Sequence, residues 1–256
     1  MGFGVVIPAR FESSRLPAKV LLDIGGKPMV VHTYERAIHS GADFVVVATD
    51  DARVVDGLAK WDIEAMLTRK EHRSGSERIA QVAEELGLAQ DAVVVNVQAD
   101  EPLIPPAVIR QVANNLVTRS SFDVATLCEP IHTEAQLFDP NAVKVVTDQA
   151  GRALYFSRAP IPWYRDAFAD GDRASKSLHF RHIGIYAYRV GYLLRYVALP
   201  ACELETVESL EQLRVLYHGG SLHCEIAEED PGPGIDTPDD LADIRALFAA
   251  RSRTDG

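Results

Sequence analysis

The chain has 256 residues, of which 47% are hydrophobic and 25% are charged, a composition typical of a folded globular protein. Its 37 acidic residues outnumber its 26 Lys and Arg residues, and the net charge of −11 argues against a broad nucleic-acid-binding surface. The three cysteines lie far apart, so neither a zinc ribbon nor a disulfide framework is indicated. Because the N-terminus lacks a signal-peptide pattern and no apolar run approaches membrane-spanning length, we expect a cytoplasmic protein without membrane insertion.

The first half of the chain alternates apolar runs with helical patterns. Runs that are apolar on both faces, as in covered strands, occur at residues 5–7, 44–48 and 93–97. Helical patterns follow at residues 28–40, 52–61, 77–86 and 105–117. This alternation predicts an α/β fold with a mostly parallel sheet flanked by helices.

A polar loop with three cations follows the first apolar run. Pro8 ends that run, because proline has no N–H for the hydrogen bonds of a strand, and Arg10, Arg15 and Lys19 come after it. Ligands of open parallel sheets bind at the carboxyl ends of the strands. The loop is therefore a candidate phosphate site, and a solvated basic loop is the alternative at this point.

Two carboxylates in other parts of the chain sharpen this hypothesis. Asp100 follows the third apolar run, where it could cap a helix or hold a divalent metal ion. Asp236 follows a glycine- and proline-rich turn, and it also fits the start of the last helix, with Thr237 as the N-cap. Together with the cation loop, the two acids suit a metal-assisted phosphoryl or nucleotidyl transfer, in which cations stabilise the developing charge.

The pattern changes after residue 123. Strand-like pieces occur at residues 124–128, 143–147, 153–157 and 183–188, followed by a helix at 206–217 and a strand at 222–227. The connections are long, so we expect a mixed sheet with an insertion, and we expect the apolar segment 159–182 to pack against a second subunit. Arg158 and Arg165 flank proline-rich turns and could bind a substrate carboxylate bidentately, with surface ion pairing as the alternative.

Several segments in this order resemble one known family over residues 3–247. They read IPARFESSRLPAKVLLDIGGKPMVVH, VVVNVQADEPLIP, NAVKVV, ALYFSRAPIPW, RHIGIYAY, VESLEQLR and PGPGIDTPDDL. The chain resembles the 3-deoxy-manno-octulosonate (Kdo) cytidylyltransferase family, also called CMP-Kdo synthetases. The resemblance implies one nucleotidyltransferase domain over residues 1–256, of the nucleotide-diphospho-sugar transferase (glycosyltransferase-A-like) fold, with a sugar-binding and dimerisation insertion around 124–190. It further implies a cytoplasmic homodimer that uses Mg²⁺ to couple CTP to Kdo with release of pyrophosphate, for lipopolysaccharide biosynthesis.

The resemblance also assigns roles to individual positions. The nucleotide site would comprise Ala9, Arg10, Arg15, Lys19, Ser74, Arg78 and Gln98. The sugar site would comprise Gln98, Arg158, Arg165, His182, Tyr186, Glu211 and Gln212. Asp100 and Asp236 would hold the metal, and these two acids with Lys19 and Arg10 would be the catalytic residues.

The chain departs from the family pattern at Ala99, Tyr164 and Pro233. The methyl group of Ala99 replaces a glycine, which is tolerable unless φ is positive there. These departures leave open a cytidylyltransferase for a related acid sugar, such as sialic acid or an 8-amino Kdo analogue. A glycosyltransferase would be expected to carry a DxD motif, and Asp50-Asp51 lacks that spacing. A nucleotide-sensing module without catalysis would not need both acids and the full cation loop.

Overall fold

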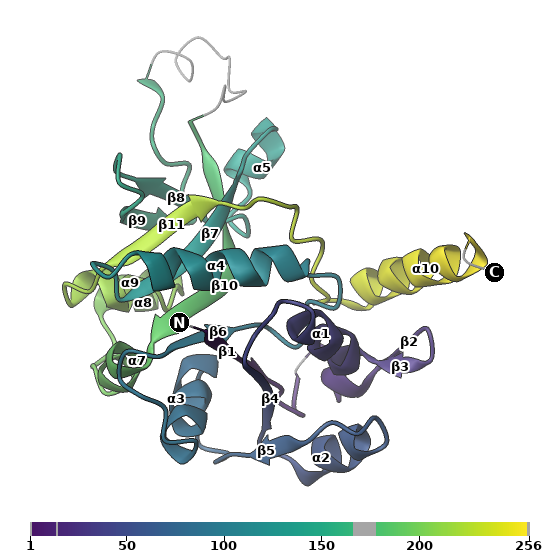
Figure 1. The fold of residues 1–256 in the computed structure, drawn as a ribbon. Coiled ribbons are helices and arrows are strands. Elements are labelled where there is room, and N and C mark those ends of the chain that lie inside the picture. Colours follow the sequence, from purple (N-terminus) through teal and green to yellow (C-terminus); the bar gives the residue numbers. More distant parts are fainter. Residues whose placement is uncertain (1, 14, 166–177, 255–256) are drawn as a thin grey trace.

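A computed structural model describes residues 2–13, 15–165 and 178–254, which form a central sheet with helices on both faces (Figure 1). The strands of this sheet are β1 (Phe3–Pro8), β4 (Phe44–Thr49), β5 (Ala65–Leu67), β6 (Val93–Asn96), β7 (Val124–Pro130), β8 (Lys144–Thr147), β9 (Ala153–Ser157), β10 (Phe180–Arg189) and β11 (Leu222–Ile226). A small hairpin pairs β2 (Asp23–Ile24) with β3 (Lys27–Pro28). The helices are η1 (Lys19–Leu21), α1 (Met29–Ile38), α2 (Ala52–Ala59), α3 (Gly75–Glu85), α4 (Pro106–Thr118), α5 (Glu134–Phe138), α7 (Val190–Tyr196), α8 (Glu203–Glu208), α9 (Leu213–Tyr217) and α10 (Pro238–Thr254).

The strand order is β11-β7-β10-β6-β1-β4-β5, with β8 beside β10 and β9 beside β8. Strands β6, β1, β4 and β5 are parallel, as are β7 and β11. Strand β10 runs antiparallel between β6 and β7 and so joins the two parallel groups. The predicted α/β fold with a mostly parallel mixed sheet is therefore confirmed.

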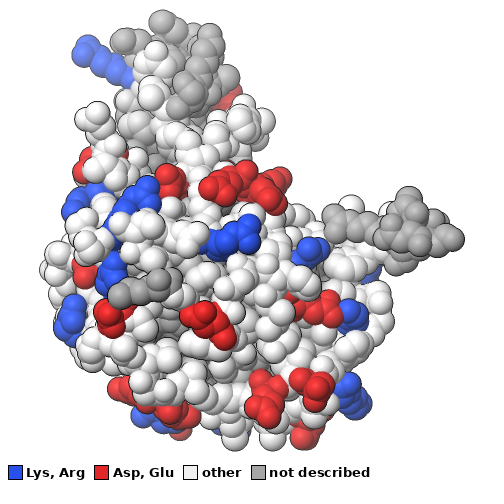
Figure 2. All heavy atoms as spheres, in the orientation of Figure 1, with Lys and Arg blue, Asp and Glu red and all other residues white. Residues whose placement is uncertain are grey.

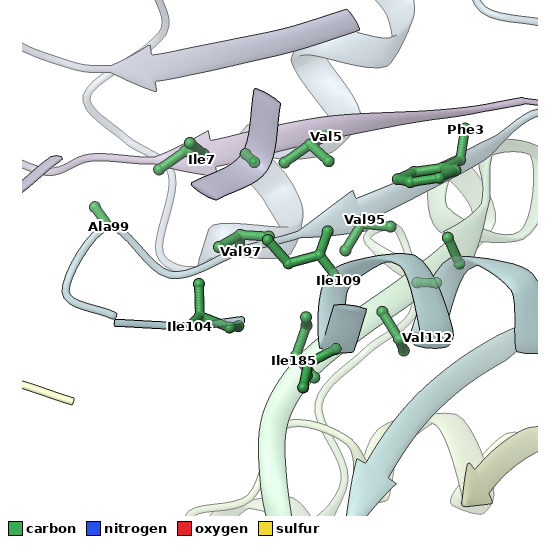
Figure 3. Packing of buried hydrophobic residues seen from close by; sticks show 14 of the residues in the cluster. Phe3, Val5, Ile7, Val95, Val97, Ala99, Ile104, Ile109, Val112 and Ile185 are labelled. Atoms are coloured by element: carbon green, nitrogen blue, oxygen red, sulfur yellow. The ribbon is translucent and has the colours of Figure 1, made fainter. Parts of the chain in front are cut away.

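Apolar side chains of the central strands alternate between two cores, one on each face of the sheet. Val5 and Ile7 lie in the core under α1, α2 and α4, whereas Val6 lies in the core under α3, α7 and α9. Figure 3 shows Val95 packed with Ile109 and Val112 between β6 and α4. This burial on both faces is the reason that these strands are apolar at successive positions.

The second half of the chain adds strands to the same sheet. The range 124–190, predicted as an insertion, includes the central strands β7 and β10 as well as the pair β8 and β9. Residues 166–177 of the segment predicted to contact a second subunit lie outside the described residues. In the described part of that segment, Trp163 and Tyr164 are 65% and 42% exposed.

The single helix predicted over residues 206–217 is wrong. The structure has two short helices there, α8 and α9, because Ser209 adopts a left-handed conformation with φ of 52°. The guanidinium of Arg158 binds this break: its Nε donates to the carbonyl of Glu208 at 2.7 Å. The break leaves Glu211 and Gln212 between the two helices, beside a cavity described below.

Acidic and basic side chains are interspersed over the face shown in Figure 2. No helix in the described ranges is both long and apolar enough to cross a membrane. Helix α10 extends away from the body of the protein (Figure 1). Its first turns are anchored by Leu241 and Ile244, which share a small core with Leu16 of the cation loop.

Candidate active site

A cavity of about 370 Å³ opens where β1 and β6 end. Its lining includes the three cations of the loop, Arg10, Arg15 and Lys19, together with Asp100 and Asp236. The carboxyl ends of neighbouring parallel strands meet at one edge of the sheet, which is where α/β folds bind ligands. With Gln98, six predicted site residues from three separate parts of the sequence thus share one cavity.

Lys19 lies at the centre of the charges in this cavity. It begins η1 and is only 8% exposed, and its Nζ lies 2.6 Å from Asp100 Oδ2 and 3.0 Å from Asp236 Oδ1. The guanidinium of Arg15 donates to the same Asp236 oxygen at 2.9 Å. Because a nearly buried ammonium is stable only when it is paired, the two carboxylates fix the position of Lys19.

Main-chain hydrogen bonds hold the two acids beside each other. The N–H of Ile235 donates to the carbonyl of Asp100 at 3.0 Å, which joins the loop after β6 to the turn before α10. The N–H groups of Asp236 and Thr237 both donate to Asp240 Oδ2, and Thr237 Oγ1 accepts from the N–H of Asp240. These bonds lower the pKa of Asp240, with the bond from Asp236 as the largest cause. The predicted N-cap at Thr237 is confirmed, and the first turn of α10 positions Asp236.

The two carboxylates fit a magnesium ion better than a metal held by protein ligands alone. Within the described residues, no group of three or more His, Cys, Asp or Glu side chains is placed to hold a metal. Mg²⁺ is commonly bound by one or two carboxylates plus substrate phosphates and water. Asp100 and Asp236, which already share one cation, have the right chemistry for that arrangement.

A smaller cavity of about 70 Å³ adjoins the first, and the two share Gly75 and Gln98. Three more predicted sugar-site residues line it, Tyr186, Glu211 and Gln212. The hydroxyl of Tyr196 donates to the carbonyl and to Oε1 of Glu211, at 3.0 and 3.1 Å, and so fixes that side chain. Burial raises the pKa of Tyr186 well above its usual value, so this hydroxyl stays neutral.

His182 lies next to this smaller cavity, with its ring 5.4 Å from that of Tyr186. Its Nε2 is 2.9 Å from Thr126 Oγ1, and the Thr126 hydroxyl donates to the carbonyl of Ile185 at 2.7 Å. Since that hydroxyl has one hydrogen, we assign Nε2 of His182 as the donor, which leaves Nδ1 as an acceptor. Burial lowers the pKa of His182 to about 3, so the ring is neutral near neutral pH.

Three predicted nucleotide-site residues lie behind or beside the larger cavity. Ala9 is fully buried, and its N–H donates to the carbonyl of Ala48 at 2.8 Å. The hydroxyl of Ser74 accepts from the N–H of Glu77 at 3.2 Å as the N-cap of α3, and Ser74 faces a separate groove. Arg78 is fully buried. Of the described residues of α3, Gly75 lines the larger cavity and Arg78 does not.

Two predicted sugar-site arginines are absent from the described linings of the two cavities. The guanidinium of Arg158 binds the carbonyls of Glu208, Ser209 and Pro140, so it supports the α8–α9 break. Arg165 is exposed and precedes residues 166–177, which lie outside the described ranges. Their predicted contact with a substrate carboxylate stays a prediction.

The backbone at Ala99 is compatible with its methyl group. Among the described non-glycine residues, positive φ values occur at Ala18, Asp62 and Ser209. Ala99 therefore has an ordinary backbone conformation, and its carbonyl accepts from the hydroxyl of Thr33 at 3.1 Å. Replacement of the family glycine introduces no strain here.

Sequence reasoning missed Tyr196, which lines the smaller cavity, and Asp50, which contacts Arg78 and the N–H of Phe11. Asp50 directly follows β4, just as Asp100 follows the end of β6 on the same edge of the sheet. Its place at the end of a strand could have marked Asp50 as a candidate in the sequence. Tyr196 has no such signal, because its contact with Glu211 depends on how α7 packs beside the α8–α9 break.

A family model described as cytidylyltransferase matches residues 4–226. The chain belongs to the cytidylyltransferase family. This cytidylyltransferase is 55% identical over 252 residues to "3-deoxy-manno-octulosonate cytidylyltransferase" of Vibrio vulnificus, a match that covers 98% of this chain and 100% of the relative. It is 52% identical to the protein of the same name from Hahella chejuensis, with 98% and 99% covered.

A solved structure is also similar to this cytidylyltransferase. Its description is CMP:2-keto-3-deoxy-manno-octonic acid synthetase complexed with CTP, and it matches with a TM-score of 0.88 and 42% identity. The match covers 97% of this chain and 99% of that one. The resemblance seen in the sequence and the expected nucleotide-sugar transferase fold are both confirmed.

Proposed function

We propose that this cytidylyltransferase activates Kdo by transferring CMP from CTP to the anomeric hydroxyl of the sugar, with release of pyrophosphate. The observation that carries the proposal is a pair of adjoining cavities, one lined by Arg10, Arg15 and Lys19 and the other by tyrosine and amide side chains together with Glu211. Relatives that are 52–55% identical over nearly the whole chain are named for this reaction.

The larger cavity suits the triphosphate of CTP. Arg10, Arg15 and Lys19 supply positive charge in a chain whose net charge is −11, so the attraction for the anion is local. During the transfer, negative charge grows on the departing pyrophosphate, and fixed cations stabilise that charge more strongly than water does. Arg15 and Lys19 lie close enough to the acids to share this task.

The smaller cavity suits the sugar acid. Gln98 lies between the two cavities, so it can bind at the junction of nucleotide and sugar. Gln212 supplies an amide, Tyr186 a neutral hydroxyl and His182 an acceptor at Nδ1 for sugar hydroxyls.

We further propose that Asp100 and Asp236 hold Mg²⁺. When bound, the ion would offset phosphate charge and lower the pKa of the attacking hydroxyl. The protein contributes the orientation of the two carboxylates, through the bonds of Ile235 and Asp240, and the cations that bind the leaving group.

The proposed product would be the activated sugar for lipopolysaccharide biosynthesis in the cytoplasm. We also propose a homodimer, because Trp163, Tyr164 and Leu178 are large apolar side chains that are exposed on either side of the undescribed segment. Light scattering of the purified chain would test the dimer, and a monomeric mass at micromolar concentration would contradict it.

An assay of pyrophosphate release tests the function. We expect release only when CTP, Mg²⁺ and Kdo are all present, and a marked loss when any one is omitted. Sialic acid and an 8-amino Kdo analogue should be compared as acceptors, and a preference for either would assign the enzyme to that sugar. Release of pyrophosphate without an acceptor, or none with the full mixture, would contradict the proposal.

A further inference from the structure

A buried ion pair lies behind the wall of the larger cavity. The guanidinium of Arg78 in α3 donates through Nη2 to Asp50 Oδ2 at 2.9 Å, and the Arg78 side chain is completely buried. Its Nη1 donates to the hydroxyl of Thr68, which in turn donates to the carbonyl of Thr49 at 2.9 Å. The pair thus joins the end of β4 to the first turns of α3.

The same carboxylate also contacts the cation loop. Asp50 Oδ1 accepts from the N–H of Phe11 at 3.4 Å, and Phe11 directly follows Arg10. The guanidinium of Arg53 lies 3.6 Å above the ring of Phe11 and holds it from the other side. The start of the cation loop is therefore fixed by the turn after β4.

The guanidinium of Arg10 is fixed from the α3 side. Its Nη2 donates to the carbonyl of His72 at 2.7 Å, in the segment that leads into α3. The His72 ring contacts Gln81 of the same helix at 2.5 Å. The backbone next to Arg10 is therefore held by the turn after β4, and its guanidinium is held by the segment before α3. The Asp50–Arg78 pair joins that turn to α3.

Electrostatics explain why a carboxylate is needed at this place. Burial, and to a smaller extent the charge of Arg10, lower the pKa of Arg78, whereas Asp50 raises it. Two arginines from different segments repel each other when they come close, and a carboxylate beside them offsets this repulsion. Without Asp50, we expect Arg10 to move away from its place in the cavity.

We propose that Asp50 is a positioning residue for the nucleotide, which acts through Arg78 and the N–H of Phe11 to hold Arg10 at the triphosphate cavity. In this arrangement Arg78 acts from behind the wall and does not touch the nucleotide. The inference rests on the proposed function, because it assigns the effect to CTP. It separates the two substrates, since Tyr186, Glu211 and Gln212, which are predicted to bind Kdo, lie on β10 and at the α8–α9 break, whereas α3 adds Gly75 and Ser76 to that cavity.

The test is Asp50→Asn, which keeps the size of the side chain and removes its charge. We expect the KM for CTP and the Kd for CTP by calorimetry to rise about 10-fold or more, as for loss of a charged hydrogen bond. The KM for Kdo should stay within about twofold. Asp56→Asn makes the same change on the exposed face of α2, and it should leave both constants unchanged.

A double variant tests whether the pair acts as a unit. Asp50→Asn combined with Arg78→Gln should weaken CTP binding no more than Arg78→Gln alone, because either change breaks the same contact. Arg78→Lys keeps the charge but loses the planar fork, so it should show the same selective loss at a smaller size. If the thermal transition shows that Asp50→Asn does not fold, the same constants for CTP and Kdo, measured on Arg78→Lys, test the inference.

Two outcomes would overturn the inference while wild-type protein releases pyrophosphate normally. One is an unchanged affinity for CTP in a folded variant. The other is an equal rise in the KM values for CTP and Kdo, which indicates general damage. An inactive wild-type protein would instead overturn the proposed function.

Discussion

The ammonium of Lys19 lies 2.6 Å from the carboxylate of Asp100, and the same ammonium contacts Asp236 at 3.0 Å. A side chain expected to bind phosphate therefore binds both acids expected to bind a metal ion. A divalent cation that binds these oxygens must compete with the lysine for them. If Asp100 and Asp236 held Mg²⁺, the ammonium of Lys19 would become available to a phosphate in the same cavity.

This competition predicts how Lys19→Met responds to magnesium. Without the ammonium the two carboxylates repel each other, so we expect the free energy of unfolding to fall by about 1–3 kcal/mol in the absence of metal. Mg²⁺ should then raise the melting temperature of the variant more than that of the wild type. Lys27→Met is a control, because Lys27 pairs with Glu35. Equal shifts in variant and wild type would contradict the competition.

Removal of one acid should stop turnover without unfolding the protein. For Asp236→Asn we expect kcat to fall by about 100-fold or more, because charge on the transferring group loses its stabilisation. Asp100→Asn should do the same. Asp239→Asn is the matched control, since Asp239 lies exposed on the first turn of α10. Near-normal pyrophosphate release from either variant would remove these acids from the catalytic site.

The two cavities predict separate effects on the two substrates. Gln212→Ala should raise the KM for Kdo about 5-fold, the usual size for one lost hydrogen bond, and leave the KM for CTP unchanged. Gln149→Ala, an exposed turn position, serves as the control. If the KM for CTP rose instead, the smaller cavity would have to be assigned to the nucleotide.

The low pKa of His182 predicts a pH dependence of stability. Its folded value is about 3 and its ordinary value is 6.5, so the unfolded chain takes up a proton first as the pH falls. The stability from the neutral ring is complete above about pH 6.5 and is lost towards pH 3, by at most about 1.4 kcal/mol per pH unit. His182→Gln should make the free energy of unfolding less dependent on pH in this window. The exposed His218→Gln should not, and equal curves for wild type and His182→Gln would contradict the assignment.

Restoring the family glycine should bring no benefit. Ala99→Gly should lower the free energy of unfolding by up to about 1 kcal/mol, because glycine has more freedom in the unfolded chain. Since the backbone of Ala99 is unstrained, kcat should stay within about twofold of the wild type. A clear gain in activity would show that the methyl group obstructs the cavity.

The parts of the molecule that depend on local patterns were predictable. Buried strands such as β1 and β6 are apolar at successive positions, and the prolines at 105 and 106 mark the start of α4. The position of the site was predictable from the carboxyl ends of those strands, where parallel sheets bind ligands. The break at Ser209 was not predictable, because the carbonyls of Glu208 and Ser209 bind Arg158, which is remote in the sequence. The Asp50–Arg78 pair was hidden for the same reason, since each residue alone resembles a surface charge.

The junction at Gly75 and Gln98 has a consequence for ligand design. Both residues line both cavities, so ligands bound in the two cavities would lie next to each other. A compound that links a nucleotide analogue to an acid-sugar analogue would present its second half at a high effective concentration once the first half is bound. Such a bisubstrate compound should bind about 10² to 10⁴ times more tightly than either half, provided that its linker spans the two cavities.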